Sequence, residues 1–408
     1  MRAVVMFRAR CTSSVSSPEQ LQFRALNRRS DSGLSREGVL LSSTILLVVL
    51  FTLTGFVTRM YHAQQQKIAA DWFARGEADL KSGLASEAVL DFRTALVYSP
   101  DTDLYQFRLA QAVGAMGRTE EARSYLLNLW AREPDSGPVN LELARVEAHQ
   151  GLKVEALRYY HRAIYGAWSE DPPQQRAQVR TELCEYLLGQ GDIPRAQAEI
   201  GLLAASVPPK DVTAHARVGR LFIRAQDPRK ALDEFQLALE IDRRQPEALE
   251  GAGEAAFLLN DFVQAEHYLD LALKENPTNV NALELLTAAR EAVGSDPFEM
   301  TLPVDVRRQR VEQAFHLAVA RLQSCLGDGG TSHSGVAAEP ALEQLSARVK
   351  AIEPEVNDAN LRRHPELEPQ VMALVFDIEQ TTSQSCGQPQ GPEAALLLLA
   401  RKYGSAKK

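Results

Sequence analysis

One stretch near the beginning of the chain is apolar and lacks any acidic or basic residue. It covers the 21 residues from Gly38 to Thr58, between Glu37 and Arg59. As a helix this stretch spans about 30 Å, which matches the hydrocarbon thickness of a bilayer. Its Ser and Thr hydroxyls can each bond to a carbonyl in the preceding turn. Residues 38–58 are therefore predicted to form a transmembrane helix in contact with lipid.

Two other interpretations agree less well with this stretch. A buried core helix rarely lacks every charge over such a length. A cleavable signal peptide usually has a short charged segment before its apolar run, whereas 38 residues precede Val39 here. No small-x-small cleavage site follows either, because Arg59-Met60-Tyr61-His62 occupies that place. We therefore interpret residues 38–58 as an uncleaved anchor.

Charge is distributed unevenly about the anchor. Residues 1–38 hold seven Arg and three acidic residues, for a net charge of +4. Since the whole chain has a net charge of −8, the remaining residues have a net charge of −12. The basic bias upstream predicts a cytoplasmic N-terminus with a basic, disordered tail (1–37) and an exported body. In a bacterium, that body would lie in the periplasm at the inner membrane. An acidic body argues against nucleic acid as a partner.

Beyond the anchor, small and large apolar residues recur with a period close to 34 residues. The period is marked by Ala88, Ala122, Ala156, Ala196, Ala231 and Ala265. Twelve residues before each alanine stands a small residue: Gly76, Ala110, Ala144, Cys184, Gly219 and Gly253. Four residues after each alanine stands a large apolar one: Phe92, Leu126, Tyr160, Ile200, Phe235 and Leu269. Small side chains let two antiparallel helices approach, and the large residue fills the remaining space.

Other residues mark turns in the same register. Gly83, Gly117, Gly151 and Gly191 fall between paired helices, with Gln226 and Asn260 in the last two units, while Pro ends four of the units. Taken together, these residues resemble the tetratricopeptide repeat (TPR) family over residues 69–276. The resemblance implies an all-α fold, a TPR superhelical solenoid of about six helix-turn-helix repeats. The units begin near Ala69, Asp103, Gly137, Ala177, Val212 and Pro246.

Three segments accompany the repeats. Residues 59–68 are expected to form a juxtamembrane helix or linker. The insertion 171–176 lies between the third and fourth units and is expected to bend the superhelix there. A helix at 280–293 is expected to cap the last unit, because stacked units otherwise leave one apolar face uncovered. The solenoid with its cap therefore covers residues 69–294.

The TPR resemblance also implies a binding surface. In this family the first helix of each unit lines a concave groove that holds peptides or partner helices, through its fifth, ninth, twelfth and thirteenth residues. The residues expected to contact a partner are Phe73, Phe107, Arg145, Arg220 and Arg224. Apolar contacts would supply most of the binding energy, and charges would select the partner. The alternative is a solvated charged face with aromatic rings partly buried by neighbouring helices.

The period ends after Gly294, and Pro297 and Pro303 mark a linker at 295–304. Residues 305–408 are expected to form a small helical bundle, with helices at 305–326, 339–352, 367–383 and 392–403.

Two cysteines are expected to meet in this bundle. Cys325 and Cys386 each stand at or just beyond the C-terminal end of a long helix, and one intervening helix would bring both ends to the same side. In an oxidising compartment this geometry favours a disulfide, worth ~4 kcal/mol on the chain-entropy model. Two unpaired thiols are the alternative. Cys184 occupies a small-residue packing position and is expected to be a buried free thiol.

The sequence lacks the common motifs of catalytic and cofactor sites. A Walker phosphate loop, Gly-x-Gly-x-x-Gly, His-Glu-x-x-His, Gly-x-Ser-x-Gly and the haem-attachment pattern are all missing. The sequence therefore predicts no catalytic residue, metal, cofactor or small-molecule substrate, and it favours a protein that is not an enzyme.

Three functions remain open from the sequence. The first is a membrane-anchored TPR scaffold that binds other proteins in the bacterial cell envelope. The second has the same parts facing the cytoplasm, as an adaptor that recruits soluble proteins to the membrane. The third assigns thiol exchange or catalysis to the C-terminal bundle, with the repeats serving it.

Overall fold

The computed structural model describes residues 36–299, 301–327 and 339–405. Within these ranges the chain forms helices and no β-strand. The tail predicted for residues 1–37 lies outside the described residues, apart from its last two, which begin helix α1. The all-α fold predicted from the sequence is confirmed.

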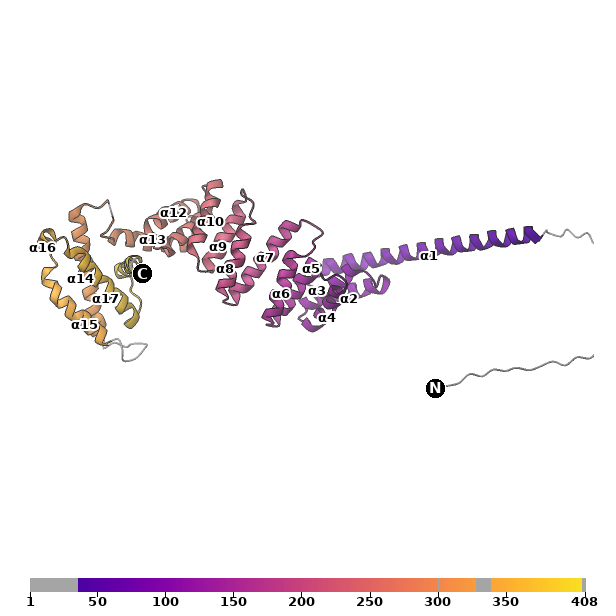
Figure 1. The fold of residues 1–408 in the computed structure, drawn as a ribbon, viewed down its shortest axis with the longest axis horizontal. Coiled ribbons are helices and arrows are strands. Elements are labelled where there is room, and N and C mark those ends of the chain that lie inside the picture. Colours follow the sequence, from indigo (N-terminus) through magenta and orange to yellow (C-terminus); the bar gives the residue numbers. More distant parts are fainter. Residues whose placement is uncertain (1–35, 300, 328–338, 406–408) are drawn as a thin grey trace, which may run out of the picture.

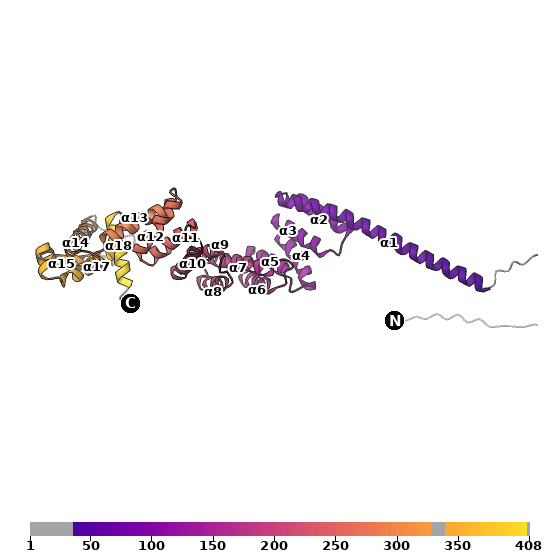
Figure 2. The same ribbon diagram turned by 90° about the horizontal axis from the view of Figure 1, so that it is seen from above.

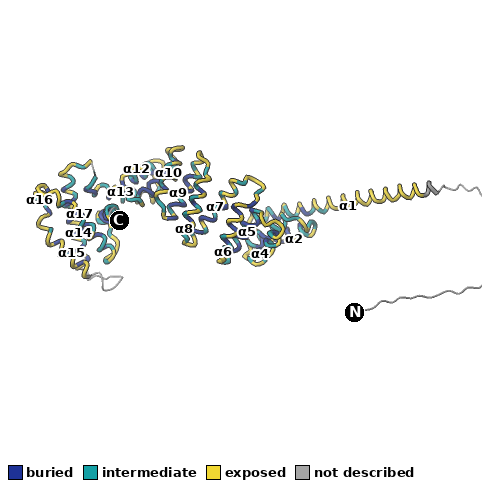
Figure 3. Tube along the Cα trace, viewed as in Figure 1, coloured by how far each residue is buried: buried dark blue, intermediate teal, exposed yellow. Residues whose placement is uncertain are grey.

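The first helix, α1 (Arg36–Lys81), joins the predicted anchor to the first repeat without interruption. Residues 56–75 contain neither Gly nor Pro, so nothing in this part of the sequence interrupts a helix. The segment 59–68, predicted as a helix or a linker, is thus helical. The apolar part of α1 is long enough to cross a membrane by its length and composition, and none of it is buried against the rest of the described chain. Figure 1 shows α1 projecting away from the other helices, and Figure 3 shows its exposed surface.

Six antiparallel helix pairs follow one another in the described part of the chain, and Figure 1 shows their order along the molecule. The first pair is the end of α1 with α2 (Ala85–Tyr98). The others are α3 (Asp103–Ala115) with α4 (Thr119–Arg132), α5 (Gly137–His149) with α6 (Lys153–Tyr165), α7 (Pro172–Gly189) with α8 (Ile193–Ala204), α9 (Val212–Arg224) with α10 (Pro228–Ile241), and α11 (Pro246–Leu258) with α12 (Phe262–Glu275). Helix α13 (Val280–Ser295) packs on α12. The predicted solenoid of six repeats is therefore present.

The small and large residues of the 34-residue period meet inside each pair. Phe92 is fully buried against Gly76, and a β-carbon at Gly76 would come within 2.7 Å of the Phe92 ring. Ala88 is also fully buried. Figure 3 shows buried and exposed residues alternating along the paired helices. Close approach of the helices thus depends on the missing side chain.

The turns inside the pairs have one backbone geometry. Gly83 has φ of 78° and Gly191 has φ of 71°, and the equivalent residues Gln226 and Asn260 have φ of 59° and 61°. Glycine adopts this left-handed region readily, and Asn does so more easily than most other residues. The glycines that recur at these turns therefore match the left-handed backbone conformation found there.

The insertion 171–176 lengthens a helix. Helix α7 starts at Pro172, five residues before the predicted start of the fourth unit, and Asp171 caps it by accepting a hydrogen bond from the Gln174 amide. Pro at the first helical position is compatible with this, since its missing N–H would have no partner inside the helix.

The C-terminal helices are α14 (Val304–Gly327), α15 (Glu339–Ile352), α16 (Asp358–Arg363), α17 (Leu367–Ser385) and α18 (Pro392–Ser405), with a 3₁₀ turn, η1 (Glu353–Glu355). The four predicted helices are present, whereas η1 and α16 were not predicted. The hydrophobic core does not stop where the repeats end. One buried cluster runs from Ala256 and Leu269 in the last pair, through α13, to Leu399 in α18.

The predicted linker is packed between the repeats and the C-terminal helices. Asp296 is 4% exposed, and its carboxylate accepts hydrogen bonds from Lys402 Nζ at 2.8 Å and from the Tyr403 hydroxyl at 2.8 and 2.9 Å. Arg310 Nη1 donates to the Asp296 carbonyl at 2.7 Å. Figure 2 shows α18 beside α13, which this joint connects. The repeats and the C-terminal helices thus form one continuous packed body.

Candidate protein-binding groove

A groove lies between the first helices of the second, third and fourth units. This α3–α5–α7 groove has a volume of about 770 Å³. Its apolar lining includes Leu104 and Phe107 from α3, Leu141 from α5 and Val179 from α7, with Trp168 at one end. Leu104 is 51% exposed, while Phe107 and Leu141 are partly buried. The groove therefore offers apolar contact area to a partner.

Two of the predicted partner contacts line this groove. These are Phe107, the fifth residue of the second unit, and Arg145, the ninth residue of the third unit. Leu141, the fifth residue of the third unit, lines the groove as well. Phe73, Arg220 and Arg224 do not line it. The five residues chosen from the sequence are thus not brought together in a single site.

Arg145 is held by carboxylates of its own chain. Its Nε and Nη2 donate to the two oxygens of Glu182 at 2.8 and 2.6 Å, and its Nη1 donates to Glu142 at 2.8 Å. Gln111 Nε2 also donates to Glu142, at 2.7 Å. The hydrogen bond to Glu182 raises the pKa of Arg145 above its usual value, so the guanidinium remains charged and bound.

The same type of bridge recurs along the first helices. Arg220 Nη1 donates to Glu254 at 2.8 Å, and its Nη2 lies 3.8 Å from Glu250, both in the next first helix. Arg108 Nε lies 3.0 Å from Glu77 of the preceding unit. These arginines therefore connect neighbouring repeats, while the side chains of Arg145 and Arg220 remain 42% and 38% exposed.

The remaining two predicted contacts have different surroundings. The Phe73 ring stacks on Tyr105 at 4.6 Å between centroids and lies 5.6 Å from Phe92, so neighbouring helices partly bury it. Arg224 ends α9 and is exposed, and no ion pair or hydrogen bond of its side chain is found among the described residues. Of the three predicted arginines, Arg224 has the guanidinium most available to a partner.

The charges around the α3–α5–α7 groove are mostly negative. Five lining residues are acidic and two are basic, for a net charge of −3: Asp103, Glu133, Glu142, Glu170 and Glu182 against Arg108 and Arg145. Glu133 and Glu170 are exposed, and no ion pair of theirs is found within the described part of the chain. Sequence reasoning missed both, because they lie outside the first helices. Glu170 directly precedes the insertion 171–176, and that insertion was the available signal.

A second hollow lies on the other side of the α7 N-terminus. It measures about 520 Å³ and is lined by Pro173 and Ala177 of α7, by Val207, and by Arg217 and Val218 of α9. Gln178 borders both hollows. The extended start of α7 therefore divides the binding face into two parts.

Comparison with known families supports this architecture. A family model described as tetratricopeptide repeat matches residues 107–172, 182–246 and 219–280. The chain therefore contains tetratricopeptide repeats. The matched residues include most of α3, all of α5 and half of α7, and hence most of the residues that line the groove. A search of curated proteins found no match.

Several solved structures of TPR proteins are similar to this chain at low identity. YrrB, described as a TPR protein with an unusual peptide-binding site, is 16% identical, with a TM-score of 0.37, over 47% of this chain and 96% of YrrB. PilF of Pseudomonas aeruginosa is 20% identical, with a TM-score of 0.33, over 53% and 91%. The C-terminal part of a TPR protein of Cytophaga hutchinsonii is 14% identical, with a TM-score of 0.43, over 58% and 93%.

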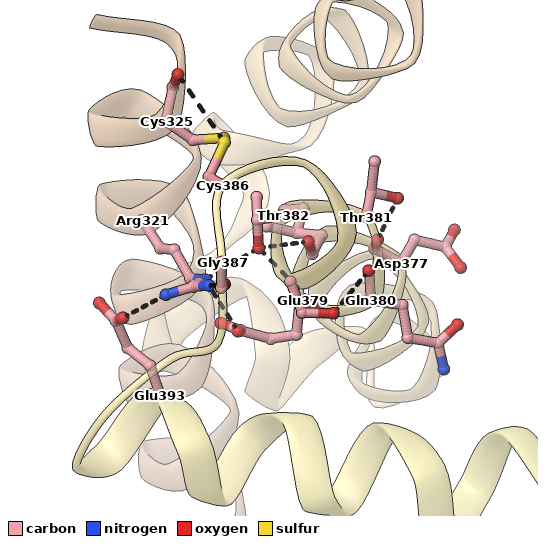
Figure 4. Close-up of polar contacts among 12 residues, drawn as sticks. Arg321, Cys325, Asp377, Glu379, Gln380, Thr381, Thr382, Cys386, Gly387 and Glu393 are labelled. Atoms are coloured by element: carbon pink, nitrogen blue, oxygen red, sulfur yellow. Dashed lines mark hydrogen bonds and ion pairs between the residues drawn. A yellow bond between two sulfur atoms is a disulfide. The ribbon is translucent and has the colours of Figure 1, made fainter. Parts of the chain in front are cut away.

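The second feature predicted for this TPR protein, the cysteine pair, lies in the C-terminal helices. Cys325 and Cys386 form a disulfide with their Cα atoms 5.9 Å apart (Figure 4). The helices α14 and α17 run side by side with these ends together. The connection between them contains α15, η1 and α16, where the sequence suggested one helix. Cys325 is 5% exposed, and Cys386 is exposed. Burial raises the pKa of the free thiol of Cys184 to about 12.

A polar network adjoins this disulfide. Arg321, one turn before Cys325, donates to the Thr382 hydroxyl at 2.9 Å, to Glu393 at 3.0 Å and to the Gly387 carbonyl at 2.7 Å (Figure 4). Its Nε lies 3.5 Å from Glu379, which is fully buried. The disulfide and Arg321 thus hold the segment after α17 against α14. Among the described residues, no group of three or more His, Cys, Asp or Glu side chains is arranged to hold a metal ion.

Proposed function

We propose that this TPR protein is a membrane-anchored scaffold that binds other proteins in the bacterial cell envelope, with its body in the periplasm. Tetratricopeptide repeats support a scaffold for protein–protein interaction. The finer proposal concerns where the scaffold stands and which surface it uses.

The observation that carries the proposal is that α1 is one uninterrupted helix with an exposed apolar part. Its apolar part has no buried residue in the window of highest hydropathy, and the same helix continues into the first repeat. A soluble protein gains stability by burying such a surface, whereas lipid covers it without any further protein. Because the helix is continuous, the anchor would hold the repeats at a defined distance from the bilayer.

Two features support an exported body. Basic residues are concentrated before the anchor, which favours a cytoplasmic N-terminus. The Cys325–Cys386 disulfide is of the kind that persists in oxidising compartments such as the periplasm. The two features are independent, since one concerns residues 1–38 and the other the C-terminal helices.

Reporter fusions test the location. Alkaline phosphatase joined after Lys408 should be active in bacteria, because it needs an oxidising compartment, and green fluorescent protein at the same place should stay dark. The reverse pattern would reject the periplasmic body and favour the cytoplasm-facing adaptor.

Site-specific photo-crosslinking tests the scaffold. A crosslinking residue at Leu104, in the groove, should capture another protein in intact membranes. The matched control is Val154, which is 75% exposed on α6 and lies outside the groove. Crosslinks of equal strength at both positions, or none at Leu104, would contradict binding at the groove.

A further inference from the structure

We propose that the α3–α5–α7 groove binds a segment of a partner protein in which apolar side chains are flanked by lysine or arginine. This inference rests on the proposed function, since it takes the groove to hold a protein, and it adds the chemistry of that protein.

The apolar part of the segment would contact the floor of the groove. Leu104, Phe107 and Leu141 lie on successive first helices, so their side chains follow the direction in which the repeats stack. Leu104 is 51% exposed, whereas Leu109 of the same helix is 1% exposed and belongs to the core. Leu104 thus leaves apolar surface in contact with water. Covering such surface removes apolar area from water, which favours an apolar occupant.

The basic charges of the groove are already neutralised within the chain. Arg145 is bound by Glu142 and Glu182, and Arg108 by Glu77. An acidic partner would have to break these hydrogen bonds or leave its own carboxylates unpaired beside them. The groove therefore disfavours an acidic segment.

The free acidic charges lie at the rim. Glu133 follows α4, Glu170 precedes α7, and both are exposed without an ion pair inside the described chain. A lysine or arginine near each would gain a partner without costing an existing bond. Pairs at an exposed rim mainly accelerate association and select the partner, and salt screens them over about 10 Å at 0.1 M.

Two other occupants are disfavoured by charge and by position. The body of a second copy has a net charge of −12, and the groove is also negative, so the two would repel each other. The basic tail at residues 1–35 would lie across the bilayer from the groove in the proposed topology. A partner that is both apolar and basic is the occupant that complements the groove.

Peptide binding to the full chain in non-ionic detergent tests this chemistry. The probe is a fluorescein-labelled 12-residue peptide of Leu, Phe and Arg, compared with one in which Glu replaces every Arg. Fluorescence anisotropy should show binding of the Arg peptide only. The double variant Glu133→Lys/Glu170→Lys should weaken it about tenfold and reduce its salt dependence. The matched control, Glu240→Lys/Glu291→Lys, changes two exposed glutamates outside the groove and should bind normally.

Each outcome decides one level of the proposal. Equal binding of the two peptides, or equal weakening by both double variants, would overturn the basic partner. If the Leu104 crosslink forms in membranes and survives Glu133→Lys/Glu170→Lys, the groove holds a protein of different chemistry. If no Leu104 crosslink forms, the proposed function itself fails. Loss of that crosslink on deletion of residues 1–35 would assign the groove to the chain's own tail and overturn the proposal.

Discussion

Glu379 is a carboxylate in unfavourable surroundings. It is fully buried, and neither of its oxygens has a hydrogen-bond donor among the described residues, although Arg321 Nε lies 3.5 Å away. Burial raises the pKa of Glu379 from 4.5 to about 7, against the opposing charge of Arg321, and the negative charge of Glu393 adds to the rise. The folded protein therefore keeps the proton on Glu379 to a higher pH than the unfolded chain does.

This raised pKa gives stability a definite pH dependence. Because the folded-state pKa exceeds that of the unfolded chain, the contribution of Glu379 to stability is greatest below about pH 4.5 and falls as pH rises to about 7. The fall from this residue is at most roughly 3 kcal/mol, at 1.36 kcal/mol for each pH unit. Glu379→Gln should flatten this part of the curve, as measured by denaturant unfolding between pH 4.5 and 8. An unchanged slope, equal to that of the exposed control Glu291→Gln, would contradict the assignment.

Gly76 shows how a single residue keeps two helices in contact. A methyl group there would lie 2.7 and 2.8 Å from two carbons of the buried Phe92 ring, so the ring or the helix would have to move. Gly201, in α8, has nothing within 4 Å of the same position. Gly76→Ala should therefore lower the free energy of unfolding by about 1–3 kcal/mol. Gly201→Ala should leave it unchanged or raise it by up to ~1 kcal/mol, because Ala favours helix.

Thermal unfolding of the two glycine variants checks this difference. Equal stability of Gly76→Ala and Gly201→Ala would contradict the prediction, because it would mean that α1 and α2 accommodate the added methyl group without loss of stability. The period of small residues was visible in the sequence because each one serves the same local contact. Residue-scale packing of the repeats could accordingly be predicted, whereas the burial of Glu379 depends on helices that the period does not include.

At the scale of elements, the boundaries that follow local signals agree with the sequence. Helices begin at the predicted residues Asp103, Gly137, Val212 and Pro246. Two predicted starts differ. Ala69 lies inside the continuous helix α1. Helix α7 starts early, because Asp171 can cap a helix and Pro172 can begin one, so the insertion extends the helix. Helix α16 was missed because six residues are too few to show a helical period.

The disulfide between α14 and α17 has a measurable effect at this scale. It closes a loop across a sequence separation of 61 residues, so it limits the freedom of the unfolded chain. Cys325→Ser/Cys386→Ser should lower the free energy of unfolding by ~4 kcal/mol on the chain-entropy model. Reduction of the unmodified protein should have a similar effect, and reduction of the double variant none. A melting temperature that neither change alters would argue against a structural disulfide.

For the whole molecule, the repeats and the C-terminal helices share one core. The predicted boundary at 295–304 crosses the buried cluster that includes Leu286 and Leu399. Asp296 lies at the crossing, where burial and its hydrogen bond from the Tyr403 hydroxyl raise the pKa of that tyrosine. The sequence showed two prolines at this place and suggested a linker, because a joint made by residues a hundred positions apart has no local signal.

Asp296→Ala tests this coupling. It should remove the buried carboxylate that accepts hydrogen bonds from Lys402 and Tyr403, at a cost of about 1–3 kcal/mol. Hydrogen exchange should then accelerate in both α13 and α18, with little change in the distant α5 and α6. Faster exchange confined to α18 would show that the two halves are not coupled through this residue.

The amino-acid sequence alone was sufficient to predict several features of this TPR protein: the 34-residue period, the helix pairs, the turns and the apolar stretch of α1. These follow from spacing and residue type, which act between neighbours in one or two helices. Three-dimensional packing alone decided that Arg145 and Arg220 are engaged by glutamates of adjoining units, and that Glu133 and Glu170 remain free beside the groove. Charges pair according to distance in space, and residues far apart in the chain become close only after the helices have stacked.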